Sequence, residues 1–284
     1  MKYIVPNMAL PGWPHKQRRS CGRSSIGHLF HYWLTAWGLS QELGLEMLHE
    51  PIESDSFHYE DFLNLGSQFK QTKDIGAEII QLPRLEFCHF RDEPQETKEK
   101  NVALLKEIID NGPDNTIFRT NFDNFPGLLS KHGLSLIPKI QEAYWTKNKG
   151  RKNISGEQGP TIAVHIRRGD ITESFPDRWY TIQQYDELFK RLSERFSGYK
   201  FIIVSEGSIE DFAPLHKYDP VYLLNEDDFD SFHCMVDSEV LVVGLSTWSV
   251  IAALICKNSV VYPTLHNFTN WQSFGERFIH FSEV

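Results

Sequence analysis

The chain has 284 residues, 40% of them hydrophobic, which is enough for one large domain or two modest ones with cores of their own. Its formal net charge of -9 argues against a general nucleic-acid binder, because such proteins present a basic surface to phosphate backbones. No stretch is long and apolar enough to span a membrane, and the N-terminus lacks a signal-peptide core, so we expect a cytoplasmic protein or a soluble catalytic fragment.

The first expected elements are a short strand at 2–5 and a helix at 26–44, joined by a basic, Gly-containing loop. A basic loop that opens onto a helix N-terminus is a plausible anion site, since free backbone amides and the helix dipole favour negative charge there. A core helix behind a solvated basic loop explains the same pattern. For the aromatic residues of this stretch we prefer that second interpretation.

The middle of the chain is less informative. Helices are expected at 61–72, 96–111 and 134–145, and a strand at 115–122. Residues 79–87 indicate an irregular or edge strand because they contain Pro83, which cannot donate a backbone hydrogen bond.

The clearest linker is 147–160, which is polar, Gly-rich and without apolar periodicity. We therefore expect an N-terminal domain over 1–150 and a C-terminal domain over 151–264. Segment 265–284 is aromatic-rich and is expected to pack back on the N-terminal domain.

Beyond the linker, apolar strands alternate regularly with helices, which predicts a doubly wound parallel sheet. The expected strands are 161–167, 200–207, 220–224, 239–244 and 258–263, and the expected helices are 180–196, 208–217, 230–238 and 246–256.

The most informative stretch is residues 161–170, TIAVHIRRGD. Its apolar run ends abruptly in charge, as in a buried strand that delivers polar groups to its carboxyl end, where open α/β sheets bind ligands. Arg167 and Arg168 favour an anion there, because the planar guanidinium fork matches phosphate oxygens. Strand alternation predicts that Arg167 shares a face with His165 and that Arg168 points the other way. A surface ion pair at a strand end is the competing interpretation.

A second informative stretch is residues 239–256, in which an apolar strand ends at Gly244 and Ser246-Thr247 open a helix. Hydroxyls and free amides at a helix N-terminus can hold a phosphate. A plain N-cap by Ser246 explains the local pattern equally well.

Together these motifs resemble the superfamily of α1,2-, α1,6- and protein O-fucosyltransferases, whose signature is His-x-Arg-x-Gly-Asp or a close variant. Residues 26–32 fall on the family's Gly-Asn-Gln-hydrophobic-Phe-Gln-Tyr motif, with Gly27 and His28 standing where Asn and Gln are usual. The resemblance implies an α/β fold of GT-B type, with two Rossmann-like domains facing across a cleft. It also implies an inverting, metal-independent glycosyltransferase that transfers L-fucose from GDP-fucose to a glycan or glycoprotein hydroxyl, with no cofactor beyond this donor.

The resemblance also implies roles for individual residues. Arg167 would hold the donor diphosphate, and Glu173 in the following loop is our first candidate for the general base. Glu239 would contact the guanine edge. The other expected donor contacts are His165, Arg168, Asp170, Glu206, Ser246 and Thr247, with possible loop contacts at Gly27 and His28.

Three rival interpretations remain. Asp228-Phe229-Asp230 fits the Asp-x-Asp pattern of metal-dependent GT-A glycosyltransferases, which would change the donor and add a metal. The tripeptide at 168–170 matches the integrin-binding sequence of adhesion modules, although it ends a predicted buried strand. A nucleotide-sugar-binding protein without catalysis is the third, and the departures at Gly27 and His28 permit it.

Overall fold

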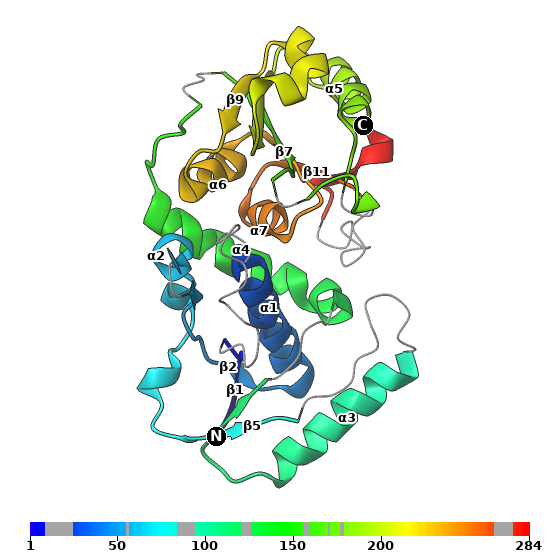
Figure 1. Cartoon of the computed structure of the whole chain (residues 1–284). Coiled ribbons are helices and arrows are strands. Elements are labelled where there is room, and N and C mark those ends of the chain that lie inside the picture. The colour runs from blue at the N-terminus through cyan, green and yellow to red at the C-terminus, as the bar shows by residue number, and fades with distance from the viewer. Residues whose placement is uncertain are drawn as a thin grey trace. The chain divides into compact units, whose positions relative to one another are not determined.

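The computed structural model describes residues 1–8, 25–54, 57–83, 95–120, 126–155, 159–169, 171–176, 179–263 and 275–284. These residues form two compact units, one up to Lys147 and one from Asn148 onward (Figure 1). Within the described ranges, every helix is too short or too polar to cross a bilayer.

The first unit is built on a four-stranded sheet with the order β2-β1-β6-β5. β1 (Lys2–Val5) pairs in parallel with β2 (Glu46–Met47) on one side and β6 (Thr116–Arg119) on the other. β5 (Glu78–Gln81) pairs in parallel with β6 and forms one edge, so the edge strand expected at 79–87 is confirmed in position and ends before Pro83. A separate two-stranded antiparallel sheet joins β3 (Glu53–Ser54) to β4 (Phe57–His58).

The helices of the first unit are α1 (Ser25–Leu43), α2 (Tyr59–Leu63), α3 (Gln95–Asn111) and α4 (Pro126–Asn148), with short 3-10 turns at Leu65–Gln68 and Thr72–Asp74. α1 and α3 confirm the expected helices. The continuous helix expected at 61–72 is wrong, because Asn64 takes a left-handed conformation (φ 56°) that breaks the helix after Leu63.

The second unit is built on a six-stranded sheet with the order β12-β11-β10-β7-β8-β9, parallel throughout. Its strands are β7 (Thr161–Ile166), β8 (Lys200–Ser205), β9 (Val221–Leu224), β10 (Val240–Val242), β11 (Ser259–Tyr262) and β12 (Phe278–His280). Between them lie α5 (Ile182–Arg195), the 3-10 segment η4 (Ile209–Tyr218), α6 (Asp228–Asp237) and α7 (Thr247–Ile255). The predicted α/β alternation with a parallel sheet is confirmed.

The C-terminal residues differ from expectation. Instead of packing on the N-terminal domain, residues 278–280 form β12, which pairs in parallel with β11. A final 3-10 turn covers Phe281–Glu283, and two arginines of α5 donate to its carbonyls: Arg191 to Phe281 and Arg195 to Glu283. Residues 264–274, on which the rest of that expectation depends, lie outside the described part of the chain.

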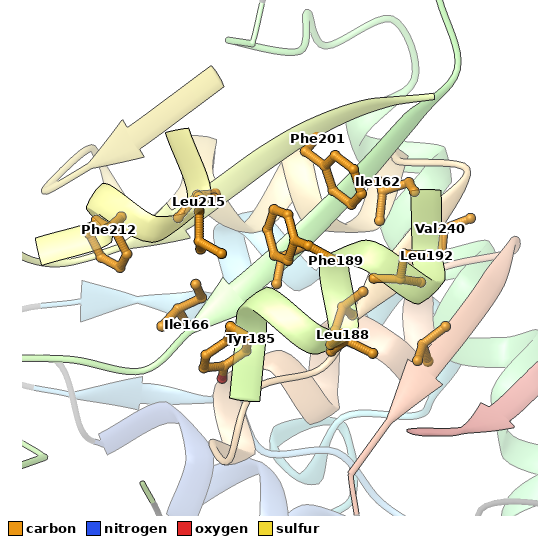
Figure 2. Close-up of a cluster of buried hydrophobic side chains, with 14 residues drawn as sticks. Ile162, Ile166, Tyr185, Leu188, Phe189, Leu192, Phe201, Phe212, Leu215 and Val240 are labelled. Carbon is orange, nitrogen blue, oxygen red and sulfur yellow. The ribbon is translucent and has the colours of Figure 1, made fainter. Parts of the chain in front are cut away.

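Both faces of β7 are buried, which explains its uninterrupted apolar sequence. Ile162, Val164 and Ile166 pack on one face with Tyr185, Leu188, Phe189 and Leu192 of α5 and with Phe212 and Leu215 of η4 (Figure 2). His165 belongs to the opposite face, where its ring lies edge-on to Trp248 of α7 at 5.4 Å between centroids. The sheet therefore separates α5 from α7, and this decides where the residues after β7 can point.

Candidate functional site

The candidate residues of the second unit gather where β7, β8 and β10 end. Ser205, the last residue of β8, donates its hydroxyl to the carbonyl of Ile166, the last residue of β7 (2.6 Å). Arg167 follows, and its Nη1 donates to the carbonyl of Leu245, in the turn between β10 and α7 (3.4 Å). Arg167 is therefore held at the carboxyl edge of the sheet beside the N-terminus of α7, the edge at which parallel α/β sheets bind ligands.

Arg168 points toward α5, on the other side of β7, as strand alternation predicts. Its guanidinium stacks on the ring of Trp179 (3.7 Å to the centroid), and Tyr185 of α5 lies 6.0 Å away. Its Nη1 donates to the carbonyl of Arg167 and its Nη2 to the carbonyl of Tyr180, both at 2.9 Å. Burial lowers the pKa of Arg168, and Tyr185, Asp211 and Glu173 oppose this shift.

Gly169 makes the turn possible. Its φ of 80° lies in the left-handed region, and a Cβ built there would sit 1.5 Å from Oε2 of Glu206, which follows β8. Glycine alone meets both conditions without a shift of the Glu206 carboxylate. The structure thus brings the Glu206 side chain against the backbone of Gly169, which directly follows Arg167 and Arg168.

His165 is buried, and no described residue forms a hydrogen bond with its Nδ1. Burial, and secondarily the charge of Arg167, lower its pKa to about 3, so the imidazole is neutral at physiological pH. Gly244 permits this packing, since a Cβ there would lie 2.5 Å from both Nδ1 and the carbonyl oxygen of His165. Neutral His165 can offer a ligand a hydrogen bond but no charge.

Ser246 and Thr247 lie at the N-terminus of α7. Ser246 is the N-cap, and its hydroxyl accepts a hydrogen bond from the backbone amide of Trp248 (3.3 Å), as the capping interpretation predicts. Thr247 is exposed as the first residue of the helix. Capping leaves the other amides of the first turn available for an anion, so the two interpretations of this turn are compatible.

Glu239 is not brought to this edge. Its carboxylate accepts hydrogen bonds from the backbone amide (2.7 Å) and the hydroxyl (3.1 Å) of Thr161, the first residue of β7. Arg167 lies six residues further along the strand, which corresponds to about 20 Å at the usual rise of a strand. The Glu239 carboxylate therefore lies at the amino edge of the sheet, and its expected contact with guanine stays a prediction.

Glu173 lies in an exposed turn after the HIRRGD stretch, where the backbone amide of Phe175 donates to the carbonyl of Thr172 (2.9 Å). The structure leaves its carboxylate accessible, as a general base requires. Asp170 lies outside the described residues. Gly27 and His28 lie in the first turns of α1 in the other unit, and their side chains are likewise outside the described part.

The Asp-x-Asp pattern occupies the first turn of α6. Asp230 pairs with Arg151 (2.5 Å), and Asp227 caps the helix by accepting from the amides of Phe229 and Asp230. Among the described residues, no group of three or more His, Cys, Asp or Glu side chains is arranged to hold a metal ion. Helix capping and an ion pair therefore account for the local acidic sequence.

Sequence reasoning missed Trp179, Tyr180 and Trp248, which surround Arg168 and His165. The signal was present, since an aromatic residue often supplies the face on which an arginine stacks. Nothing in the sequence spacing, however, shows that residue 179 returns to residue 168.

No protein-family profile and no curated protein matches this chain. Solved structures do match it. A crystal structure of apo POFUT1, a protein O-fucosyltransferase, aligns with a TM-score of 0.52 and 11% identity over 92% of this chain and 97% of that one. POFUT1 in complex with GDP (TM-score 0.52, 12% identity) covers 99% of this chain and 98% of that one. POFUT1 in complex with GDP-fucose (TM-score 0.51, 12% identity) covers 98% of each. The chain therefore has the α/β, GT-B type fold of these protein O-fucosyltransferase structures.

Proposed function

We propose that the protein is an inverting, metal-independent glycosyltransferase that transfers L-fucose from GDP-fucose to a hydroxyl of a glycan or glycoprotein. The observation that carries the proposal is Arg167, which the turn after β7 holds against the turn that opens α7. The likeness to POFUT1 structures, one of which contains GDP-fucose, supports the choice of donor. The HIRRGD sequence supports it independently.

In this reaction the acceptor oxygen forms a bond to the anomeric carbon of fucose as the bond from that carbon to the β-phosphate oxygen breaks. The electron pair of the broken bond leaves with GDP, so negative charge grows on the diphosphate. Arg167 can make bidentate hydrogen bonds to that charge, and free amides in the first turn of α7 can add a second set of donors. Groups held in place before the reaction stabilise the transition state most effectively.

The acceptor hydroxyl must lose its proton as it attacks. We assign this role to Glu173, whose carboxylate is exposed two residues beyond the buried Ile171. Glu206 and His165 complete the donor side, His165 as a neutral hydrogen-bonding group. Glu239 lies apart from these residues, because Thr161 binds its carboxylate at the opposite edge.

The test is a thermal-shift series with GDP, GDP-fucose, UDP and ADP, followed by an assay of GDP release from GDP-fucose. A ligand that binds only the native state raises the melting temperature by mass action. GDP and GDP-fucose should give the largest shifts, and GDP-fucose should be turned over. A larger shift with UDP, and none with GDP, would overturn the donor assignment.

Glu173→Gln separates binding from catalysis, because the amide keeps the size of the side chain and cannot take up the proton. We expect GDP binding near the parent value and transfer reduced by about 10² or more. Binding of GDP-fucose to the parent protein without any turnover would instead identify a nucleotide-sugar-binding protein.

A further inference from the structure

The guanidinium of Arg168 is bound by other residues of the same chain. The two Nη groups donate to the carbonyls of Arg167 and Tyr180 at 2.9 Å, and the flat face lies on Trp179 at 3.7 Å. The side chain is half-buried. Arg168 thus links Arg167, which follows β7, to Trp179 and Tyr180, which lie just before the N-cap of α5.

Several contacts hold the residues before α5 in place. Tyr180 is followed by Thr181, which forms a reciprocal capping box with Gln184: the Gln184 amide donates to the Thr181 hydroxyl (3.2 Å), and the Thr181 amide donates to Oε1 of Gln184 (2.8 Å). The Tyr180 ring also packs edge-on to Tyr185, with centroids 6.0 Å apart. Tyr185 itself belongs to the buried cluster between β7 and α5 (Figure 2). The carbonyl of Tyr180 is therefore a fixed acceptor for Arg168.

We propose that Arg168 is a positioning residue: it fastens the segment after β7 to the start of α5 and so fixes the peptide that carries Arg167, without touching the donor itself. The inference rests on the proposed function for the reaction that Arg167 serves. The two arginines then have different roles, since Arg167 points toward α7 and Arg168 toward α5. Trp179 shares the positioning role, because Arg168 stacks on its ring.

The role demands arginine. A planar guanidinium can stack on an indole and donate to two separate carbonyls at once, whereas the ammonium of lysine is a compact point charge without a flat face. If Arg168 instead contacted the diphosphate, the rate of transfer would depend on the charge of Arg168 and would not depend on Trp179.

The experiment is a double-mutant cycle of Arg168→Ala, Trp179→Leu and the double variant, with the kcat and KM of GDP-fucose turnover as readouts. Arg168→Ala should lower kcat by about 10², the effect of a misplacement near 1 Å, and Trp179→Leu should lower it in the same direction. Because both act through one contact, the double variant should be no slower than Arg168→Ala alone. Arg168→Lys should not restore the rate.

Arg277 is the matched control. Its guanidinium lies 4.1 Å from the centroid of Phe278, it donates to the carbonyls of Asn258 and Ala253, and burial lowers its pKa as it does for Arg168. Arg277→Ala should lower the melting temperature to a similar extent while kcat stays near the parent value. This comparison separates positioning from general destabilisation.

Hydrogen exchange of the ligand-free variants provides a readout that needs no donor. Peptides containing Arg167 and Thr181 should exchange faster in both single variants than in the parent. Unchanged exchange, or multiplicative losses of kcat in the double variant, or a Trp179→Leu protein with parental kcat, would overturn the proposal. If the parent neither binds GDP nor turns over GDP-fucose, the proposed function fails, while exchange alone still decides the role of Arg168.

Discussion

The two units treat the same kinds of side chain differently. In the first unit, Arg119 at the end of β6 pairs with Glu50, and buried His49 lies 3.0 Å from a carboxylate oxygen of Glu60. In the second unit, Arg167 after β7 donates to the backbone carbonyl of Leu245, and no described residue bonds to Nδ1 of buried His165. Each unit thus contains a strand-end arginine and a buried histidine.

The difference lies in the groups that the two arginines contact. Arg119 pairs with the carboxylate of Glu50, whereas Arg167 donates to the backbone carbonyl of Leu245 beside the N-terminus of α7. The charge of Arg167 contributes to the low pKa of His165, so its field acts on its neighbours. The proposed function places an anionic ligand at the carboxyl edge of the second sheet, where Arg167 and the first amides of α7 lie side by side. The first sheet has an ion pair at the corresponding edge.

The largest expected effect is that of Arg167→Ala, compared with Arg119→Ala in the first unit. Arg167→Ala should cost about 3 kcal/mol of transition-state stabilisation, because a preorganised donor to the leaving diphosphate is lost. Arg167→Lys should not restore it, since an ammonium cannot make the bidentate fork. Transfer rate and melting temperature are measured for each variant.

Arg119→Ala is the control for this prediction. It should leave the GDP-induced thermal shift intact and lower stability by about 1–3 kcal/mol, because Glu50 loses its partner. A folded Arg167→Ala protein with a parental transfer rate would remove the basis for the comparison.

The next effect concerns the stability cost of a side chain at Gly169, in the turn after β7. Gly169 and Gly150 have nearly equal φ angles, 80° and 81°, but a Cβ at Gly150 meets nothing within 4 Å whereas one at Gly169 meets Glu206. Gly150→Ala should cost about 1 kcal/mol of unfolding free energy for the left-handed backbone, and Gly169→Ala should cost more, because the Glu206 carboxylate must also move aside. Chemical denaturation measures both. Equal losses would show that Glu206 does not press on the turn.

A smaller effect is the pH dependence due to His165. Its pKa is about 3 in the folded protein and near 6.5 when unfolded, so below pH 6.5 the unfolded chain binds a proton that the folded chain excludes. Stability should therefore fall by about 1.4 kcal/mol per pH unit between pH 6 and 4 from this group alone. His165→Gln should flatten the curve of unfolding free energy against pH, and a slope identical to that of the parent would refute the assignment.

The smallest expected effect is that of a chelator. Arg167 and the amides of α7 already supply positive charge to the diphosphate, so transfer in excess EDTA should stay near its value without EDTA. If EDTA abolishes transfer and manganese restores it, the assignment moves toward Asp228 and Asp230.

Much of the second unit could be predicted because its strands are buried on both faces and therefore read as continuous apolar runs, as in β7 and β8. β12 could not, because it is a three-residue strand at the edge of the sheet, and its apolar part is only the pair Phe278-Ile279. The helix expected at 61–72 failed at Asn64, a left-handed residue that ends α2 and whose side chain, with Gly66 two positions later, was the available stop signal.

The site was predictable to the extent that it follows local geometry. The alternation of side chains along a strand is enough to predict that Arg167 and Arg168 lie on opposite sides of β7. The position of Glu239 depends instead on register, since the pairing of Val240 with Ile162 places the preceding carboxylate beside Thr161. Register between strands that are distant in the chain is fixed by tertiary packing, which a single sequence does not reveal.

The bond between Arg167 and Leu245 has a consequence for how the protein reaches its native state. These residues are 78 positions apart, whereas the residues joined by the bond between Ser205 and Ile166 are 39 apart, with α5 between them. Closing the longer loop costs more chain entropy, so β7 and β8 can associate before β10 arrives beside them. We therefore expect the contact between Arg167 and Leu245 to form late, after most of the folding barrier has been crossed. A nucleotide should accordingly slow unfolding while leaving the rate of folding unchanged.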